Sequence, residues 1–503
     1  MKKIVFTGFL FTVLILSSCS GFLDKTPYED PSAEALKDAA SAIALINGAY
    51  QPMQRPKIYN MRIWTLDIIA GNSETGGQGS GGDGDETIAL ANFTATSDNA
   101  GAKDVWRGPN PGILYCNTVL ENVPNMNIDQ KLKDRCIGEA KFLRASYYFI
   151  LVRLFGDVPL MTSTPKPGED IFPSRTDKMT IYNEVIIPDL KDAINLLPPR
   201  EDYTNSADKG RASKGAAAGT LAKVYLTLGD FQDCLNMCYK VDSLGYTLNL
   251  DYSDCFGGEP KNKNTPESLF EIQYSGVVLD GVSFWDDANQ SCWLSTYMGP
   301  RNAGFVGGKD PSGYGWNLPT QEFVDQYEPG DLRKDKTILY EGCPDFYGNK
   351  YEKNMSRTGY NVRKFLVPIS ISPEYNTNPA NIVALRYADV LLMEAEALNE
   401  LGRTSEAVAP LYKVRARAGL TNRSDIATLN QAQMREKIIH ERRMELAFEG
   451  DRWFDLIRLN NGQYALDFLH SIGRANANHN RLLYPIPQSD IDANPNLKQN
   501  PGY

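Results

Sequence analysis

The most informative pattern of apolar and polar positions lies between residues 441 and 458, where the sequence reads ERRMELAFEGDRWFDLIR. Gly450 suits the left-handed position just after a helix, and Asp451 suits the N-cap of the next helix. The segment therefore predicts two short helices joined at Gly450.

Charged residues in this segment recur three or four positions apart, which lets opposite charges meet on a helix surface. Glu441, Glu445 and Glu449 form one row with this spacing. The same spacing allows three ion pairs within the segment: Arg442–Glu445, Arg452–Asp455 and Asp455–Arg458. Large apolar residues such as Trp453 interrupt the charges, which a solvated face would not need. We predict a partly buried lattice of ion pairs with a structural role.

Two other segments repeat a helical pattern. Residues 221–231 and 394–403 each place small residues on a helix that ends at a glycine, Gly229 or Gly402, and a second helical pattern follows. Small residues allow two helices to pack closely, and these features are typical of tetratricopeptide (TPR) pairs. Residues 144–156 fit a further first helix, and residues 441–458 a further pair. The predicted fold is mainly α: a TPR-like superhelix of helical pairs with long loop-rich insertions and a few short strands.

The chain divides into regions by composition. We expect a signal peptide at 1–18, an N-terminal helical region at 19–246, a loop-rich ligand-side region at 247–381 and a C-terminal helical region at 382–503. A Gly-, Ser- and Asp-rich insertion falls at about 72–102, and short strands are predicted at 268–274 and 363–367. Residues 19–503 are expected to form one compact body.

Composition narrows the function classes. The chain of 503 residues is 42% hydrophobic and 23% charged, which is a normal globular balance. A net charge of −10 argues against nucleic-acid binding, which needs a basic surface. Aromatic residues make up 10% of the chain, including 26 tyrosines, which suits carbohydrate contact but equally a tyrosine-rich core.

The N-terminus carries an export signal. Lys2 and Lys3 precede an apolar run that is too short to span a bilayer. Leu16-Ser17-Ser18-Cys19 then has the form of a bacterial lipobox, in which Cys19 is acylated after cleavage. The alternative is an ordinary signal peptide with a chance cysteine. The remaining seven cysteines are odd in number and lack zinc-site spacing, so we expect mainly buried free thiols and at most one disulfide.

Several blocks spread along the chain resemble the SusD/RagB family. They are FLDKTP at 22–27, KFLRASYYFILVRLFGDVPL at 141–160, LRYADVLLMEAEALNEL at 385–401, VRARAGL at 414–420, the 441–458 segment and LYPIPQSDIDANPNLKQNPGY at 483–503. The resemblance implies a lipoprotein anchored through Cys19 to the outer face of the outer membrane. It also implies capture of oligosaccharides or polysaccharides as a lid over a SusC-like TonB-dependent transporter. The RagB branch is associated with peptides, so a peptide-binding lipoprotein stays open as an alternative.

Signs of catalysis are absent from the sequence. The three histidines lack metal spacing, and there is neither a nucleotide-binding glycine loop nor a G-x-S-x-G elbow. A surface glycoside hydrolase is the third alternative, since it needs only two carboxylates about 5–10 Å apart. We favour binding without catalysis and without a cofactor. Asp83, Asp85 and Glu86 bring oxygen ligands together, but they lack the EF-hand spacing, so a solvated acidic loop is favoured over a calcium site.

Sugar binding requires exposed aromatic planes together with amide, carboxylate and guanidinium groups on loops. Two sequence clusters fit, and the resemblance implies that ligand contacts come from these two regions. The first contains Arg62, Trp64, Asp67, Asn72, Glu74 and Asn92. The second contains Trp285, Asp287, Asn289, Trp293, Tyr297, Arg301, Asn302, Tyr314 and Trp316. For any single tryptophan, core packing is the commoner role.

Overall fold

The computed structural model describes residues 37–76, 84–168, 171–278, 290–301, 304–308 and 313–503. The signal segment and Cys19 therefore lie outside the described residues, as do Asp83, Trp285, Asp287, Asn289 and Asn302.

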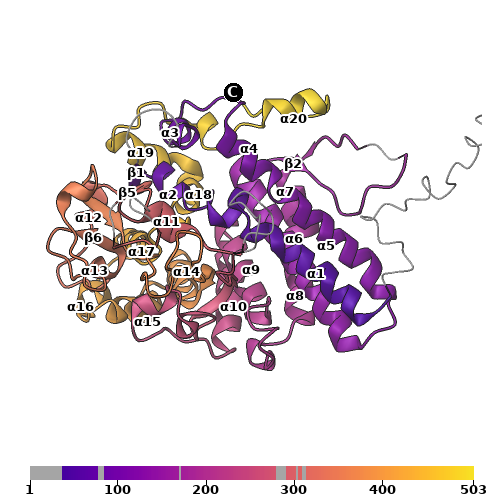
Figure 1. The fold of residues 1–503 in the computed structure, drawn as a ribbon, viewed down its shortest axis with the longest axis horizontal. Helices are drawn as coiled ribbons and strands as arrows, with labels where there is room; N and C mark the ends of the chain where they lie inside the picture. Colours follow the sequence, from indigo (N-terminus) through magenta and orange to yellow (C-terminus); the bar gives the residue numbers. More distant parts are fainter. Residues whose placement is uncertain (1–36, 77–83, 169–170, 279–289, 302–303, 309–312) are drawn as a thin grey trace, which may run out of the picture.

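Helices build the scaffold, and each packs against the next in a continuous series (Figure 1). The series begins at the α1–α5 end, passes through α9 and α10, and finishes at α14, α15 and α17. Its members are α1 (Ala39–Gln54), α5 (Asn110–Asn122), α6 (Gln130–Phe155), α8 (Ile187–Leu196), α9 (Lys214–Leu228), α10 (Phe231–Asp242), α14 (Tyr387–Glu400), α15 (Thr404–Arg417) and α17 (Gln431–Glu445). The mainly α, TPR-like prediction is confirmed.

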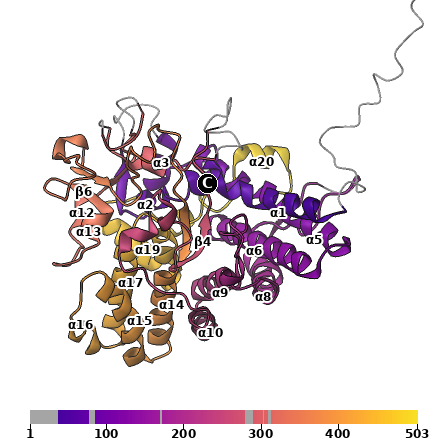
Figure 2. The same ribbon diagram turned by 60° about the horizontal axis from the view of Figure 1, so that its bottom comes forward.

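The two repeated segments form the predicted helical pairs. α9 and α10 meet at Gly229, and α14 and α15 meet at Gly402, both with φ of 76°. This left-handed conformation strains any residue other than glycine. A Cβ atom on Gly219 of α9 would lie 2.5 Å from the side chain of Leu269, so glycine permits this helix to approach the neighbouring strand. Figure 2 shows α8, α9 and α10 beside α14, α15 and α17 below the loop-rich part.

Short strands tie the insertions to the helices. In the described part of the chain they form two-stranded antiparallel ladders: β1 (Ser73–Thr75) with β5 (Asn317–Pro319), β2 (Val158–Pro159) with β3 (Arg175–Thr176), β4 (Ser268–Ile272) with β8 (Ile382–Arg386), and β6 (Ile338–Tyr340) with β7 (Tyr360–Val362). The strand predicted at 268–274 is confirmed as β4. The one predicted at 363–367 is wrong, because the amide of Leu366 bonds back to the carbonyl of Arg363 in a turn. The strand ends one residue earlier, at Val362.

The insertion at 72–102 is more regular than its composition indicates. It contains β1, α3 (Asp85–Ala91) and the start of α4 (Ala100–Arg107). The side chain of Asn99 caps α4 by accepting from the amide of Ala102 at 2.9 Å. Trp106 on α4 is buried and packs edge-on against Phe155 of α6.

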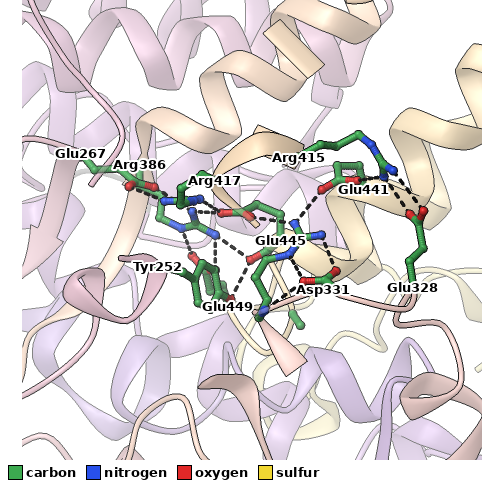
Figure 3. A network of polar contacts seen from close by, with 12 residues as sticks. Tyr252, Glu267, Glu328, Asp331, Arg386, Arg415, Arg417, Glu441, Glu445 and Glu449 are labelled. Atoms are coloured by element: carbon green, nitrogen blue, oxygen red, sulfur yellow. Dashed lines mark hydrogen bonds and ion pairs between the residues drawn. The ribbon is translucent and has the colours of Figure 1, made fainter. Parts of the chain in front are cut away.

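The predicted ion-pair lattice lies in the core (Figure 3). Glu441 and Glu445 are fully buried and Glu449 nearly so. Arg333 bridges Glu441 and Glu445 at 2.7 and 2.9 Å. The other cations bound to the three glutamates are Lys364, Arg386, Arg415 and Arg417. The prediction of a buried lattice is confirmed, and its partners come from segments far away in the sequence.

Two of the three pairs expected within the 441–458 segment are wrong. Arg442 does not reach Glu445, and it binds Asp389 at 2.7 Å and Asp455 at 2.9 Å. Arg452 stacks over the ring of Phe468 at 5.2 Å, because Asp455 already holds Arg442 and Arg458. Only the pair of Asp455 with Arg458, at 2.9 Å, forms as expected.

The join between α17 and the next helix follows the prediction only in part, because α17 ends at Glu445 and a turn over residues 446–450 precedes the next helix. Gly450 has φ of 87°, and α18 (Arg452–Arg458) starts after Asp451. The carboxylate of Asp451 does not cap α18, because it binds the ammonium of Lys223 on α9 at 2.9 Å.

Seven described cysteines are free and buried: Cys116, Cys136, Cys234, Cys238, Cys255, Cys292 and Cys343. The expectation of mainly buried free thiols is confirmed. Burial raises the pKa of the Cys292 thiol to about 12, so this thiol is unreactive at neutral pH. Across the described ranges, no helix combines the length and the apolar character needed to cross a bilayer.

Candidate functional site

The pairing of β1 with β5 brings the two sequence clusters together. Glu74 lies opposite Leu318 in this ladder, and the amide of Gly76 donates to the carbonyl of Trp316 at 2.8 Å. Residues from the first cluster therefore border residues from the second, although about 240 positions separate them in the sequence.

Six aromatic side chains meet beside this ladder, and we call them the aromatic cluster: Trp64, Trp293, Tyr297, Tyr314, Trp316 and Tyr375. Tyr297 lies at the centre. It stacks on Trp316 with ring centroids 4.7 Å apart and planes 18° apart, and it contacts Trp64 at 5.5 Å. Trp293 meets Tyr375 edge-on at 5.3 Å.

Hydrogen bonds of the backbone hold the cluster rigidly. Tyr297 belongs to α11 (Leu294–Met298), and its carbonyl accepts the amide of Trp316 at 2.8 Å. The buried side chain of Asn60 accepts from the amide of Trp293 at 2.8 Å and donates to the carbonyl of Ser291 at 3.0 Å. A ligand would thus meet aromatic rings whose positions are already fixed.

Exposure separates the cluster into a floor and a rim. Trp64, Trp293 and Tyr297 have only 4%, 6% and 2% of their surface exposed, so they form the floor. Tyr375 is 43% exposed, and Tyr314 and Trp316 are partly exposed. The rim is where a ligand could stack.

Tyr375 was missed by the sequence reasoning. It lies in the segment EYNTNP, between a glutamate, two asparagines and a proline within the loop-rich region. Its carbonyl accepts from the hydroxyl of Thr296 at 2.8 Å, which fixes the loop against α11. An aromatic residue among turn-forming polar residues was the signal that could have identified it.

Asp67 and Asn72 do not reach the surface. The carboxylate of Asp67 accepts the amides of Phe448 and Gly450 at 3.1 and 3.0 Å and the side chain of Asn72 at 2.9 Å. Burial raises the pKa of Asp67 to about 6, although these three hydrogen bonds lower it. Both side chains support the turn at Gly450, and their burial gives them a structural role in place of the expected ligand contact.

Three other candidates carry polar groups that are partly exposed. Glu74 is half exposed and binds Arg357 at 3.1 Å. Arg301 donates to the carbonyl of Tyr314 at 2.8 Å. Asn92 accepts from Arg474, whose guanidinium has its pKa lowered by burial and raised by the charge of Glu74. Arg301 thus lies beside Tyr314, and Glu74 lies on the strand that pairs with β5. Asn92 is linked to Glu74 through Arg474.

Among the described residues, the acidic loop presents few carboxylates that could bind a cation. Asp85 is exposed at the start of α3, whereas Glu86 is bound to Arg62 at 2.7 Å. Within the described ranges, one group of possible metal ligands comes together, namely Glu328, His440 and Glu441. Arg415 binds both carboxylates of this group at 2.8 Å, and Lys437 and Arg333 each bind one of them, so their charges are already balanced.

Comparisons with known proteins agree with the arrangement. A family model described as the SusD family matches residues 266–503, and a second, described as starch-binding and associating with the outer membrane, matches residues 21–226. SusD-like protein P2 of Formosa agariphila is 29% identical over the full length of both chains. The starch-binding protein SusD of Bacteroides thetaiotaomicron is 24% identical over 78% of this chain and 76% of its own.

Solved structures show the same fold. A structure named as a laminarin-binding SusD-like protein superposes with a TM-score of 0.78 and 29% identity, covering 93% of this chain and 100% of that one. With the helical series, the buried glutamate lattice and two family matches that together span most of the sequence, the chain belongs to the SusD/RagB family.

Proposed function

We propose that this protein binds glycans at the rim of the aromatic cluster without altering them chemically, and passes them to a SusC-like TonB-dependent transporter. The observation that carries the proposal is the rim itself, where partly exposed Tyr314, Trp316 and Tyr375 rest on a floor of buried aromatic rings. A pyranose ring offers an apolar C–H face that stacks on such planes.

Polar groups around the rim suit the hydroxyl groups of a sugar. Glu74 offers carboxylate oxygens, and Arg301 and Arg357 offer guanidinium donors. These groups are held by neighbouring residues, so little side-chain entropy is lost when a ligand binds.

The relatives support glucans as the first class to test. One solved relative is named as laminarin-binding, and one curated relative as starch-binding. The related family model is described as associating with the outer membrane, which supports the lipid anchor proposed at Cys19. Anchoring beside the transporter would raise the effective concentration of a weakly bound oligosaccharide.

Calorimetry on the soluble chain from Ser20 tests the proposal with laminarin oligosaccharides, starch oligosaccharides and a peptide pool. Replacing Trp316 or Tyr375 by alanine should weaken glycan binding by at least about tenfold, or ~1.4 kcal/mol, with little change in melting temperature. Tyr239→Ala is the matched control, since Tyr239 is 42% exposed on α10 and outside the cluster. Binding of peptides alone would favour the RagB-like alternative.

Two further measurements test the other parts of the proposal, namely binding without catalysis and delivery to a transporter. Release of reducing ends from the bound polysaccharide should stay at background, and sustained release would identify a hydrolase. Affinity purification of the tagged, full-length lipoprotein from its native membrane should recover a TonB-dependent transporter. Recovery of none would contradict the proposed delivery step.

A further inference from the structure

An apolar groove lies away from the aromatic cluster, between α5, α6, the segment after β2 and α20 (Gln488–Ala493). It has a volume of about 710 Å³. Four large apolar side chains on its walls are exposed: Leu114 by 46%, Met161 by 37%, Ile171 by 62% and Phe172 by 40%. Apolar surface gathered in this way on one face calls for a covering partner.

The described chain begins beyond one end of this groove. α1 runs antiparallel to α5, because Gly48 contacts Tyr115 whereas Gly108, before α5, contacts Lys57, beyond the end of α1. Continuing this register to the first turn of α1 places Ala42 level with Glu121, near the end of α5.

Glu121 marks the mouth of the groove. Its carboxylate accepts the amide of Thr164 at 2.7 Å, and Thr164 lies between Ser163 and Pro165, which line the groove. The chain that precedes Lys37 therefore starts its path at one end of the groove.

The preceding seventeen residues, 20–36, read SGFLDKTPYEDPSAEAL. Their apolar members include Phe22, Leu23, Pro27 and Tyr28. Extended chain covers about 3.3 Å per residue, so this segment reaches ~56 Å, whereas the stretch of α5 along the groove, Asn110 to Asn117, measures only ~10 Å. The segment is long enough to fill the groove and still continue to Cys19.

We propose that residues 20–36 of the same chain dock in this groove, with Phe22 and Leu23 covering its exposed apolar walls. The charges agree with this occupant. The segment carries Asp24, Glu29, Asp30 and Glu34 against one lysine, and the exposed Lys57 stands at the far end of the groove. Covalent attachment supplies a high local concentration that a separate partner lacks.

Docking would fix the orientation of the protein relative to the membrane. A free linker of this length would let the body turn in any direction on its lipid anchor. A docked linker leaves only the few residues next to Cys19 mobile. The groove end of the helical series would then face the membrane surface, independently of which ligand the aromatic cluster takes.

Cysteine cross-linking on the soluble chain from Ser20 tests the proposal, because the seven native thiols are buried. Under mild oxidation, Phe22→Cys with Ile171→Cys should form a disulfide at least about tenfold faster than Phe22→Cys with Tyr239→Cys on α10. Equal rates for the two pairs would overturn the proposal.

Alkylation of Ile171→Cys alone gives an independent readout without a cross-link. The thiol should react at least about fivefold faster when Phe22 and Leu23 are both replaced by serine, because the groove is then uncovered. Unchanged alkylation would contradict the proposal. Protection of Ile171→Cys that requires added transporter would assign the groove to that partner and overturn the docking of residues 20–36.

Discussion

Glu445 is the residue on which the buried lattice can be tested most sharply. Its carboxylate is fully buried and binds three guanidinium groups, those of Arg333, Arg386 and Arg417. Glu445→Gln keeps the size of the side chain but removes the charge, so the three buried guanidinium groups lose one negatively charged partner. Removing one partner from a buried ion pair costs about 3–5 kcal/mol, and we expect a loss of this size in the free energy of unfolding.

Urea unfolding of the wild type and of Glu445→Gln measures this loss at pH 7. The surface pair of Arg403 and Glu406 provides the control, since both side chains are exposed and Glu406→Gln should leave the unfolding midpoint unchanged. The three guanidinium groups hold the pKa of Glu445 well below its usual value of 4.5, although burial alone would raise it.

The sign of the pH dependence follows from this lowered pKa. The ionised carboxylate stabilises the fold fully above about pH 4.5, and this stabilisation is lost as the pH falls toward the lower pKa of the folded state. The difference between wild type and variant should therefore be greatest near neutrality and shrink in acid. Equal stability of the two proteins at pH 7 would refute the view that the lattice fixes helix packing.

Three further predictions each concern the substitution of a single residue. Burial, together with the charge of Asp242, raises the pKa of Glu394 to about 7. The folded state therefore loses stability as the pH rises from 4.5 to 7. Glu394→Gln should raise the melting temperature at pH 8 and not at pH 4. Trp64→Ala should destabilise the protein by about 3–5 kcal/mol in urea unfolding, because the ring is buried, and a variant of native stability would show that Trp64 is not core. Gly450→Ala should lower the melting temperature strongly, since φ is 87° and the added Cβ would lie 2.6 Å from the side chain of Ile63; a native melting temperature would contradict this strain.

Sequence spacing predicted the helices more accurately than the ion-pair partners of their charged residues. The turn at Gly450 and the glycine joins of the helical pairs depend on local backbone geometry, which single residues determine. Arg442 shows the limit, because spacing sees only neighbours on the same helix and its partner Asp389 lies on α14.

The candidate site was foreseen as two regions and not as a set of contacts. Composition cannot tell a floor from a rim. Trp64, a predicted candidate for ligand contact, is buried, whereas Tyr375, which was not among the candidates, is 43% exposed. Asp67 looked like a sugar ligand because carboxylates are common in such sites, yet its oxygens serve the amides of Phe448 and Gly450. Contacts with residues far away in the sequence decided the role of Asp67, and sequence spacing does not show such contacts.

The ladder that joins Ser73 to Pro319 also bears on how the protein matures. The aromatic cluster cannot form until both of its segments are present. The segment with Trp64 emerges early in synthesis, and the segment with Trp316 emerges only after roughly half the chain has followed. Closing so long a loop is slow compared with forming local helices. A chain that has folded its helices but not this ladder would therefore lack the rim at which we propose that a glycan binds.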